Sequence, residues 1–236
     1  MALADEQAFA ELTADAPEWI DARSVLAAIG TTRSIRKYKP DPVPDDDLTT
    51  MLWAATRAPN ASNTQPVRFI VLRRSETNLH VRQLLGEAFR AYWDGKAAKE
   101  RWWEGSGGQA DTPKGRAART MQHYVDHFEE IPVVILVCLL PLHPIDPYFV
   151  GSVYPACQNL LLAARALGYG GTLAMFHRPV VEELKAMVDI PDEVFLAGVI
   201  TLGRPAGRHG PLRRKPLTDV VFDERWGTAA GWLGTV

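Results

Sequence analysis

The chain has 236 residues, 47% of them hydrophobic and 23% charged, with a formal net charge of −2. This length and composition suffice for one α/β or α+β domain with a full core, and the near-neutral charge argues against a general electrostatic attraction to nucleic acid or acidic membranes. Residues 1–18 are acidic and lack an apolar run, so we expect no signal peptide, and the longest apolar run, 133–140, is too short to cross a bilayer. Because Cys138 and Cys157 lack the spacing of metal or redox motifs, we expect a reducing, cytoplasmic compartment.

Helical and strand patterns alternate along the chain. Apolar periodicity and end signals predict helices, in chain order, over 17–29, 45–58, 79–92, 119–130, 155–167 and 180–188. Short apolar runs predict strands over 67–72, 132–140 and 194–202, and residues 170–176 are predicted to begin a short strand or a turn. The second helix has an apolar stripe at Leu48, Met51, Leu52 and Ala55. We find no internal repeat and no reason in the composition to divide the chain into two domains.

A glycine-rich segment, Gly105–Pro113, separates the third and fourth predicted helices. Its composition is unsuited to a helix or a strand. A segment of this length inside one domain is either a lid or binding loop, or disordered, and the sequence leaves both alternatives open. It is flanked by the aromatic residues Trp102, Trp103, Tyr124 and Phe128. Such a group is more often part of a core than of a substrate pocket.

The stretch Arg33-Ser34-Ile35-Arg36 concentrates positive charge in this nearly neutral chain. On a helix, Arg33 and Arg36 would project from one face, one turn apart. The forked donors of arginine match a phosphate or an electron-rich ring edge, and Ser34 adds a short donor. The pattern suits one discrete anion, although by itself it is more often an exposed basic helix end.

Three further segments have distinctive chemistry. Residues 60–65 carry five amide or hydroxyl side chains between two prolines, which suits either recognition of a heterocycle edge or a polar surface turn. Glycines within 168–176 would let the backbone approach a ligand closely. This segment does not match the glycine pattern of a dinucleotide fold, and the chain has no P-loop. Arg213-Arg214-Lys215 is a second basic cluster, which alone would indicate a solvated tail.

No Ser/His/Asp constellation, metal-spaced histidine cluster or carboxylate pair is evident in the sequence. His143 and His177 are isolated candidates for proton delivery. For each of them, a solvated or structurally satisfied histidine is the more common explanation.

Taken in order, four segments resemble the nitroreductase family of FMN-dependent oxidoreductases: T-R-S-x-R (32–36), A-P-N-A-S-N-T-Q-P (58–66), Q-N-L-L-L-A-A (158–164) and R-R-K-P-L (213–217). The resemblance implies an α+β, three-layer fold with a mixed central sheet flanked by helices. It also implies an intertwined homodimer with FMN bound at the subunit interface. The chain would then comprise an N-terminal helical extension (1–30), an FMN-binding domain (31–226) with a lid at 90–119, and a tail (227–236).

The resemblance also implies which residues contact the flavin. Arg36 would approach its pyrimidine edge, where positive charge stabilises the reduced ring. The backbone of residues 173–176 would lie along the ring near its reactive N5, and Arg214, with Arg213 or Lys215, would hold the phosphate. The implied cofactor contacts are Arg33, Ser34, Arg36, Asn60, Asn63, Gln65, Leu173, Ala174, Met175, Phe176, Arg213 and Arg214. Many relatives have arginine in place of Thr32, so a phosphate contact there is weakened or shifts to Arg33 or the C-terminal arginines.

The activity implied is transfer of a hydride from NADH or NADPH to flavin N5, and then to a small electron-poor acceptor (a nitroaromatic, a quinone or an enone) in a ping-pong reaction. Chemistry carried by the flavin requires no catalytic side chain. Reductive dehalogenases and flavin-consuming lyases share the motifs, and a non-enzymatic flavin-binding redox protein is a further alternative. The sequence selects neither the acceptor nor one of the two nicotinamide donors.

Overall fold

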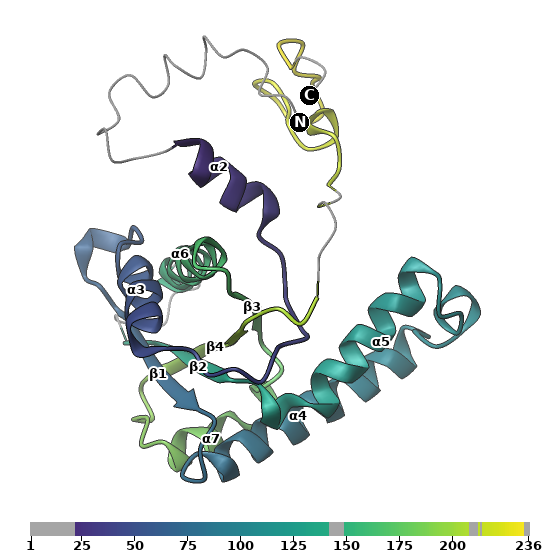
Figure 1. Ribbon diagram of the computed structural model, residues 1–236. Coiled ribbons are helices and arrows are strands. Elements are labelled where there is room, and N and C mark those ends of the chain that lie inside the picture. Colours follow the sequence, from purple (N-terminus) through teal and green to yellow (C-terminus); the bar gives the residue numbers. More distant parts are fainter. Residues whose placement is uncertain (1–21, 142–148, 208–211, 213, 234–236) are drawn as a thin grey trace. The chain divides into compact units, whose positions relative to one another are not determined.

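The computed structural model describes residues 22–141, 149–207, 212 and 214–233 (Figure 1). The chain forms two units, residues 32–208 and residues 1–31 together with 209–236. The smaller unit contains helix α2 (Ala22–Thr31) and a 3-10 turn, Leu217–Asp219. The predicted start of α2, at residue 17, lies outside the described residues, and its observed end is one residue beyond the predicted glycine stop.

The larger unit is built on a sheet whose described strands have the order β1-β2-β4-β3. The strands are β1 (Val67–Arg73), β2 (Val133–Leu139), β3 (Gly170–Ala174) and β4 (Phe195–Gly203). Their positions confirm the three predicted strands, and residues 170–174 form the strand rather than the turn that the sequence also allowed. Every neighbouring pair is antiparallel, so the described strands do not include the parallel pairing of the expected mixed sheet. β2 is buried along its whole length because helices cover both faces of the sheet.

Helices on both faces give the three layers of the predicted α+β fold (Figure 1). One face carries α3 (Asp45–Thr56) and α6 (Val153–Ala166), and the other carries α4 (Leu79–Lys99), α5 (Pro113–Asp126) and α7 (Val181–Met187). The predicted stripe of α3 is buried at Leu48, Met51 and Ala55 and half-buried at Leu52. Alternate residues of β2 enter the two cores, as the period of a strand requires.

Helix α4 continues past Tyr92, its predicted end, to Lys99. Trp93 and Ala97 are four residues apart and both buried, so this last part of the helix keeps one face in the core. The prediction stopped too early because the exposed face of this stretch is strongly polar. In the described part of the chain, no helix is long and apolar enough to cross a membrane.

Helix α5 begins at Pro113, six residues before the predicted start at Arg119. Thr112 caps it, since its hydroxyl accepts a hydrogen bond from the backbone N–H of Gly115 at 3.0 Å. A threonine at the N-cap followed by proline at the first helical position is a standard start signal. The sequence therefore contained the correct boundary, but the nearby glycines favoured a loop.

The tip of the α4–α5 hairpin, which extends beyond the sheet in Figure 1, is a packed turn. Arg119 donates to the carbonyl oxygens of Gly108 and Gln109 at 3.2 and 3.3 Å. A Cβ at Gly107 would lie 1.7 Å from the carbonyl oxygen of Trp102, so only glycine fits there. The glycine-rich segment is thus folded against its own hairpin, and its role as a lid stays a prediction.

Candidate functional site

Residues 32–39, the arginine segment, contain no helix; they bond to the edge strand β3 at Ile35 and to the residues after β4 at Lys37 and Lys39. The backbone N–H of Ile35 donates to the carbonyl of Gly171 at 2.9 Å, and that of Lys39 donates to Arg204 O at 2.8 Å. Gly170 permits this contact, because a Cβ there would lie 2.4 Å from Cγ1 of the buried Ile35. The segment is not helical, so the condition under which Arg33 and Arg36 would project one turn apart is not met.

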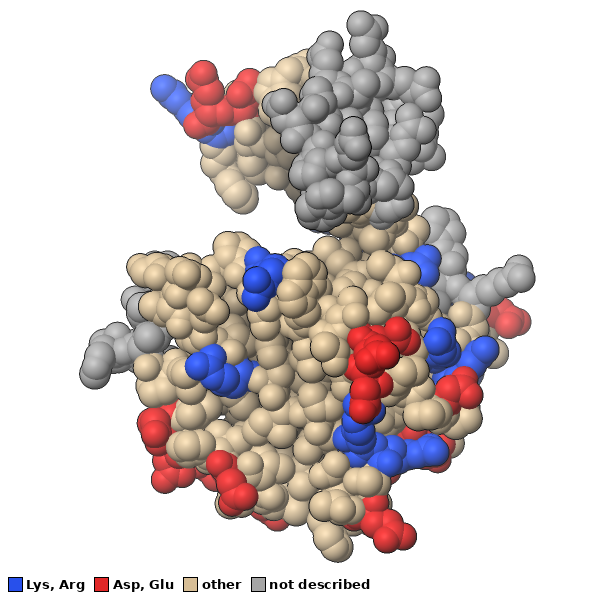
Figure 2. Space-filling view, turned by 60° about the vertical axis from the view of Figure 1, so that its left-hand side comes forward, with Lys and Arg blue, Asp and Glu red and all other residues tan. Residues whose placement is uncertain are grey.

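Arg36 is half-buried, whereas Arg33 and Ser34 are exposed. The guanidinium of Arg36 has no hydrogen-bond or ion-pair partner among the described residues. Burial raises the pKa values of the Tyr38 and Tyr124 hydroxyls, and the charge of Arg36 opposes this rise in part. A half-buried cation without a protein counter-charge is a suitable contact for an anionic or electron-rich ligand. On the face shown in Figure 2, acidic and basic side chains are interspersed over a mostly uncharged surface.

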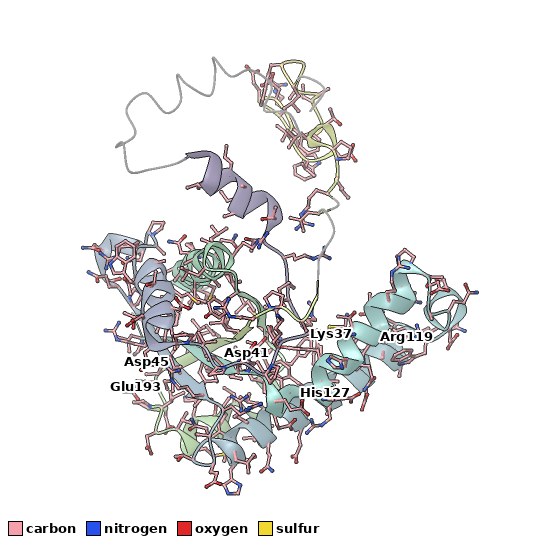
Figure 3. The ribbon with its side chains drawn as sticks, in the orientation of Figure 1. Lys37, Asp41, Asp45, Arg119, His127 and Glu193 are labelled. Atoms are coloured by element: carbon pink, nitrogen blue, oxygen red, sulfur yellow. The ribbon has the colours of Figure 1, made fainter. Side chains whose placement is uncertain are left out.

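The arginine segment also passes beside α5. Figure 3 shows Lys37 close to the C-terminal end of that helix, where His127 follows it. The pKa of His123 is lowered, first by burial and then by the charges of His127 and Lys37. The segment therefore bridges the sheet edge and the α4–α5 hairpin.

Residues 58–66, the polar loop, join α3 to β1 and contain three residues with positive φ. These are Ser62, Asn63 and Gln65, at 50°, 53° and 49°. Such backbone geometry is costly for residues other than glycine and is concentrated at functional sites. The Oδ1 atom of Asn60 accepts from the N–H of Gln65 at 2.7 Å and closes the loop. Asn60 thus has an internal structural contact, while Asn63 and Gln65 are exposed.

A cavity of about 100 Å³ lies beside the polar loop. It is lined by loop residues Asn60 and Gln65, by Arg68 and Phe69 of β1, and by Ser152 in front of α6. Arg68 donates through Nη1 to the carbonyl of Gln65 at 2.7 Å, which fixes the loop to the strand. The cavity gives the loop a concave neighbour of mixed polar and apolar character, as small-molecule sites have.

At the end of β3, Leu173, Ala174, Met175 and Phe176 are all half-buried. Phe176 packs against two aromatic rings of α4: its ring is stacked on Tyr92 with 4.2 Å between centroids, and it lies 5.0 Å from Phe89. These contacts fix the backbone that was expected to lie along the flavin.

His177 follows this segment and is buried. Its Nε2–H donates to the carbonyl of Leu196 at 3.2 Å, and within the described residues its Nδ1 has no hydrogen-bond partner. Burial lowers the pKa of the ring, which favours its neutral form. This geometry indicates a structural histidine. The other candidate, His143, lies outside the described residues.

The predicted phosphate contacts near the C-terminus belong to the smaller unit. Arg213 lies outside the described residues, and Arg214 is exposed. Their role remains a prediction. Among the described residues there is also no cluster of three or more His, Cys, Asp or Glu side chains that could hold a metal ion.

The arginine segment and the polar loop lie at opposite corners of the sheet. The former contacts Gly171, which is paired with Leu202 near the end of β4. The latter leads into Val67 of β1, which aligns through β2 with Phe195 at the start of β4. These points are separated by three strand spacings of about 4.8 Å across the sheet and by seven residues of about 3.3 Å each along the strands. Because the two displacements are at right angles, the points lie roughly 27 Å apart. One small ligand cannot contact both corners of a single chain.

The fold and these segments agree with the comparisons to known proteins. The sequence profile of the Nitroreductase family matches residues 29–204. A relative from Methanothermobacter thermautotrophicus, provisionally named NADH dehydrogenase/NAD(P)H nitroreductase, is 30% identical over 207 residues, which are 86% of this chain and 87% of the relative. This chain belongs to the nitroreductase family.

Two further proteins show the range of the similarity. A structure of a provisionally assigned nitroreductase from Desulfovibrio desulfuricans in complex with FMN superposes with a TM-score of 0.61 at 26% identity, covering 86% of this chain and 97% of that one. An iodotyrosine deiodinase from Thermotoga neapolitana is 23% identical over 189 residues, covering 80% of this chain and 91% of the relative.

Proposed function

We propose that this protein is a homodimeric FMN-dependent oxidoreductase that uses NADH or NADPH to reduce a small electron-poor acceptor, such as a nitroaromatic, a quinone or an enone. The observation that carries the proposal is the half-buried Arg36 guanidinium, which has no counter-charge among the described residues and lies on the sheet edge beside β3. Family membership and the names of the relatives support the same assignment.

The described residues fit FMN. When bound, FMN would supply hydride transfer, and the protein would bind and orient it. Arg36 would hold the electron-rich ring edge and Ser34 would donate a hydrogen bond beside it. Arg33 and the C-terminal arginines would hold the phosphate, and residues 173–176 would lie along the ring. The strained backbone of the polar loop would present Asn63 and Gln65, with Asn60 keeping the loop closed.

The sheet geometry supports the homodimer. Because the arginine segment and the polar loop are about 27 Å apart in one chain, both can contact one flavin only if the loop comes from a second copy. A composite site of this kind would make cofactor binding and dimerisation interdependent. We also propose a cytoplasmic location, since Cys138 and Cys157 are buried thiols that form no disulfide.

The first experiment measures FMN binding. Purified protein should show flavin absorbance, and Arg36→Ala should bind FMN about 10- to 100-fold more weakly, since a hydrogen bond to a charged group contributes about 1.5–3 kcal/mol. Arg36→Lys keeps the charge but loses the forked pair of donors, so its affinity for FMN should lie between those of the wild type and Arg36→Ala. Arg74→Ala, a change of an exposed arginine at the end of β1, is the control. Wild-type protein that neither carries nor rebinds FMN would disprove the proposal.

The second experiment identifies the chemistry. Anaerobic reduction of the FMN-loaded dimer with NADH and with NADPH, followed by a panel of quinone, nitroaromatic and enone acceptors, tests steady turnover. Iodotyrosine is included because of the deiodinase among the relatives. Reduction without turnover on any acceptor would instead support a flavin-binding redox protein, and consumption of the flavin would support a lyase.

A further inference from the structure

Three buried hydroxyl groups form a chain through the core that faces α4 and α5. The oxygens of Tyr38 and Tyr124 lie 2.9 and 3.0 Å from Oγ1 of Thr201, which is fully buried in the central strand β4. The hydroxyl of Tyr38 also donates to the carbonyl of Ile35 and has a longer contact, 3.3 Å, with the carbonyl of Thr201. We call these residues the hydroxyl chain. They come from three elements that are far apart in the sequence: the arginine segment, α5 and β4.

The donors and acceptors of the hydroxyl chain have a single direction. The carbonyl of Ile35 can only accept, so the Tyr38 hydroxyl donates to it. The Thr201 hydroxyl then donates to Tyr38, and the Tyr124 hydroxyl donates to Thr201. Every hydroxyl proton is thereby used. Burial raises the pKa of both tyrosines, which favours the protonated hydroxyls that this arrangement needs.

The hydroxyl chain ends on the peptide bond that precedes Arg36. The carbonyl of Ile35 belongs to the peptide bond that joins Ile35 to Arg36. The N–H of the same Ile35 is bonded to Gly171 on β3. Both polar backbone groups of Ile35 are therefore fixed, and the orientation of the next residue, Arg36, follows from them. The Arg36 charge also lowers the pKa of both tyrosine hydroxyls, against the larger effect of burial.

We propose that Tyr38, Thr201 and Tyr124 are positioning residues that hold Arg36 in the orientation in which it contacts the flavin. This inference rests on the proposed FMN-dependent function. A hydroxyl in the middle of a buried strand costs desolvation energy unless it is bonded, and here each bond leads toward the Ile35–Arg36 peptide. The chain also connects α5, and so the α4–α5 hairpin, with the cofactor segment.

Thr201→Val tests the inference with nearly unchanged side-chain shape. It removes both hydrogen bonds of the Thr201 hydroxyl. Since only the bond to Tyr38 leads to the Ile35–Arg36 peptide, it should weaken FMN binding by about three- to tenfold, the size of one hydrogen bond. Thr172→Val is the matched control: Thr172 is buried, pairs directly with Thr201 across β3 and β4, and makes no side-chain hydrogen bond with the described residues. It should bind FMN as the wild type does. Thermal unfolding of the FMN-free forms tests whether both variants fold.

Combination with Arg36→Ala separates positioning from general stability. If Thr201 acts through Arg36, Thr201→Val adds no further loss of FMN binding in the Arg36→Ala background. An equal loss in both backgrounds, or wild-type affinity in Thr201→Val, would overturn the inference. Tyr38→Phe provides the same test should Thr201→Val fail to fold. Absence of FMN binding in the wild type would instead disprove the proposed function itself, and the inference with it.

Discussion

Gly171 is the position at which one methyl group should disturb both the fold and the candidate site. A Cβ added there would lie 2.4 Å from the carbonyl oxygen of Thr201 and 3.0 Å from Cδ2 of Leu161. The first contact is with the backbone of the neighbouring strand, which cannot rotate away as a side chain can. Gly171 also accepts the hydrogen bond from Ile35 that anchors the arginine segment.

Gly171→Ala should therefore destabilise the protein by about 1–3 kcal/mol, the usual cost of overpacking a core. With a urea dependence of about 2 kcal/mol per molar, a loss of about 2 kcal/mol lowers the unfolding midpoint by roughly 1 M. Because β3 must move away from β4, toward the arginine segment, the hydrogen bond from Ile35 to Gly171 is distorted. FMN should therefore dissociate at a lower urea concentration than it does from the wild type.

Gly95→Ala is the matched control, with the same added methyl group. Gly95 lies in the interior of α4, and no atom is within 4 Å of an added Cβ. Alanine is favoured over glycine in a helix, so this variant should be more stable by about 0.5–1 kcal/mol. Urea titrations followed by far-ultraviolet circular dichroism give both values. A Gly171→Ala midpoint equal to that of the wild type, or a lower midpoint for Gly95→Ala, would refute the reasoning.

Two further predictions concern buried basic groups. The folded-state pKa of His177 is depressed by burial, so below about pH 6.5 the unfolded chain binds a proton first and stability falls as the pH drops. His177→Gln should flatten this loss between about pH 7.5 and about pH 5 in urea titrations, leaving the part that comes from His123. An unchanged slope would contradict this prediction. Arg82, whose pKa burial lowers to about 10, donates to the carbonyls of Leu72, Glu129 and Ile131. Arg82→Met leaves these carbonyls without that donor and should cost at least about 3 kcal/mol in the same assay, whereas a near-neutral result would show that they find other partners.

The local elements were largely predictable from the sequence because their causes are local. The apolar stripe of α3 and the short apolar runs of the strands repeat with the period of each structure. Helix ends were less certain. The end of α4 depends on Trp93 and Ala97 reaching the core, and the start of α5 depended on a cap at Thr112 beside glycines that favoured a loop.

The candidate site was predictable as a set of segments, but not as an arrangement. The arginine segment is held at the sheet edge because Ile35 bonds to Gly171, a residue 136 positions later. No local pattern in the sequence indicates that bond. The hydroxyl chain was missed entirely, since nothing in the residues around Tyr38, Tyr124 or Thr201 indicates that their oxygens meet.

By itself, then, the sequence determined the periodic elements and the short motifs that resemble the nitroreductase family, because backbone period, turn chemistry and side-chain type act over a few residues. Only the tertiary structure decided the antiparallel strand order, the separation of the arginine segment from the polar loop, and the contacts around Arg36. These depend on which distant strands pair and in which register, and that choice is made by burial of the whole core rather than by any one segment.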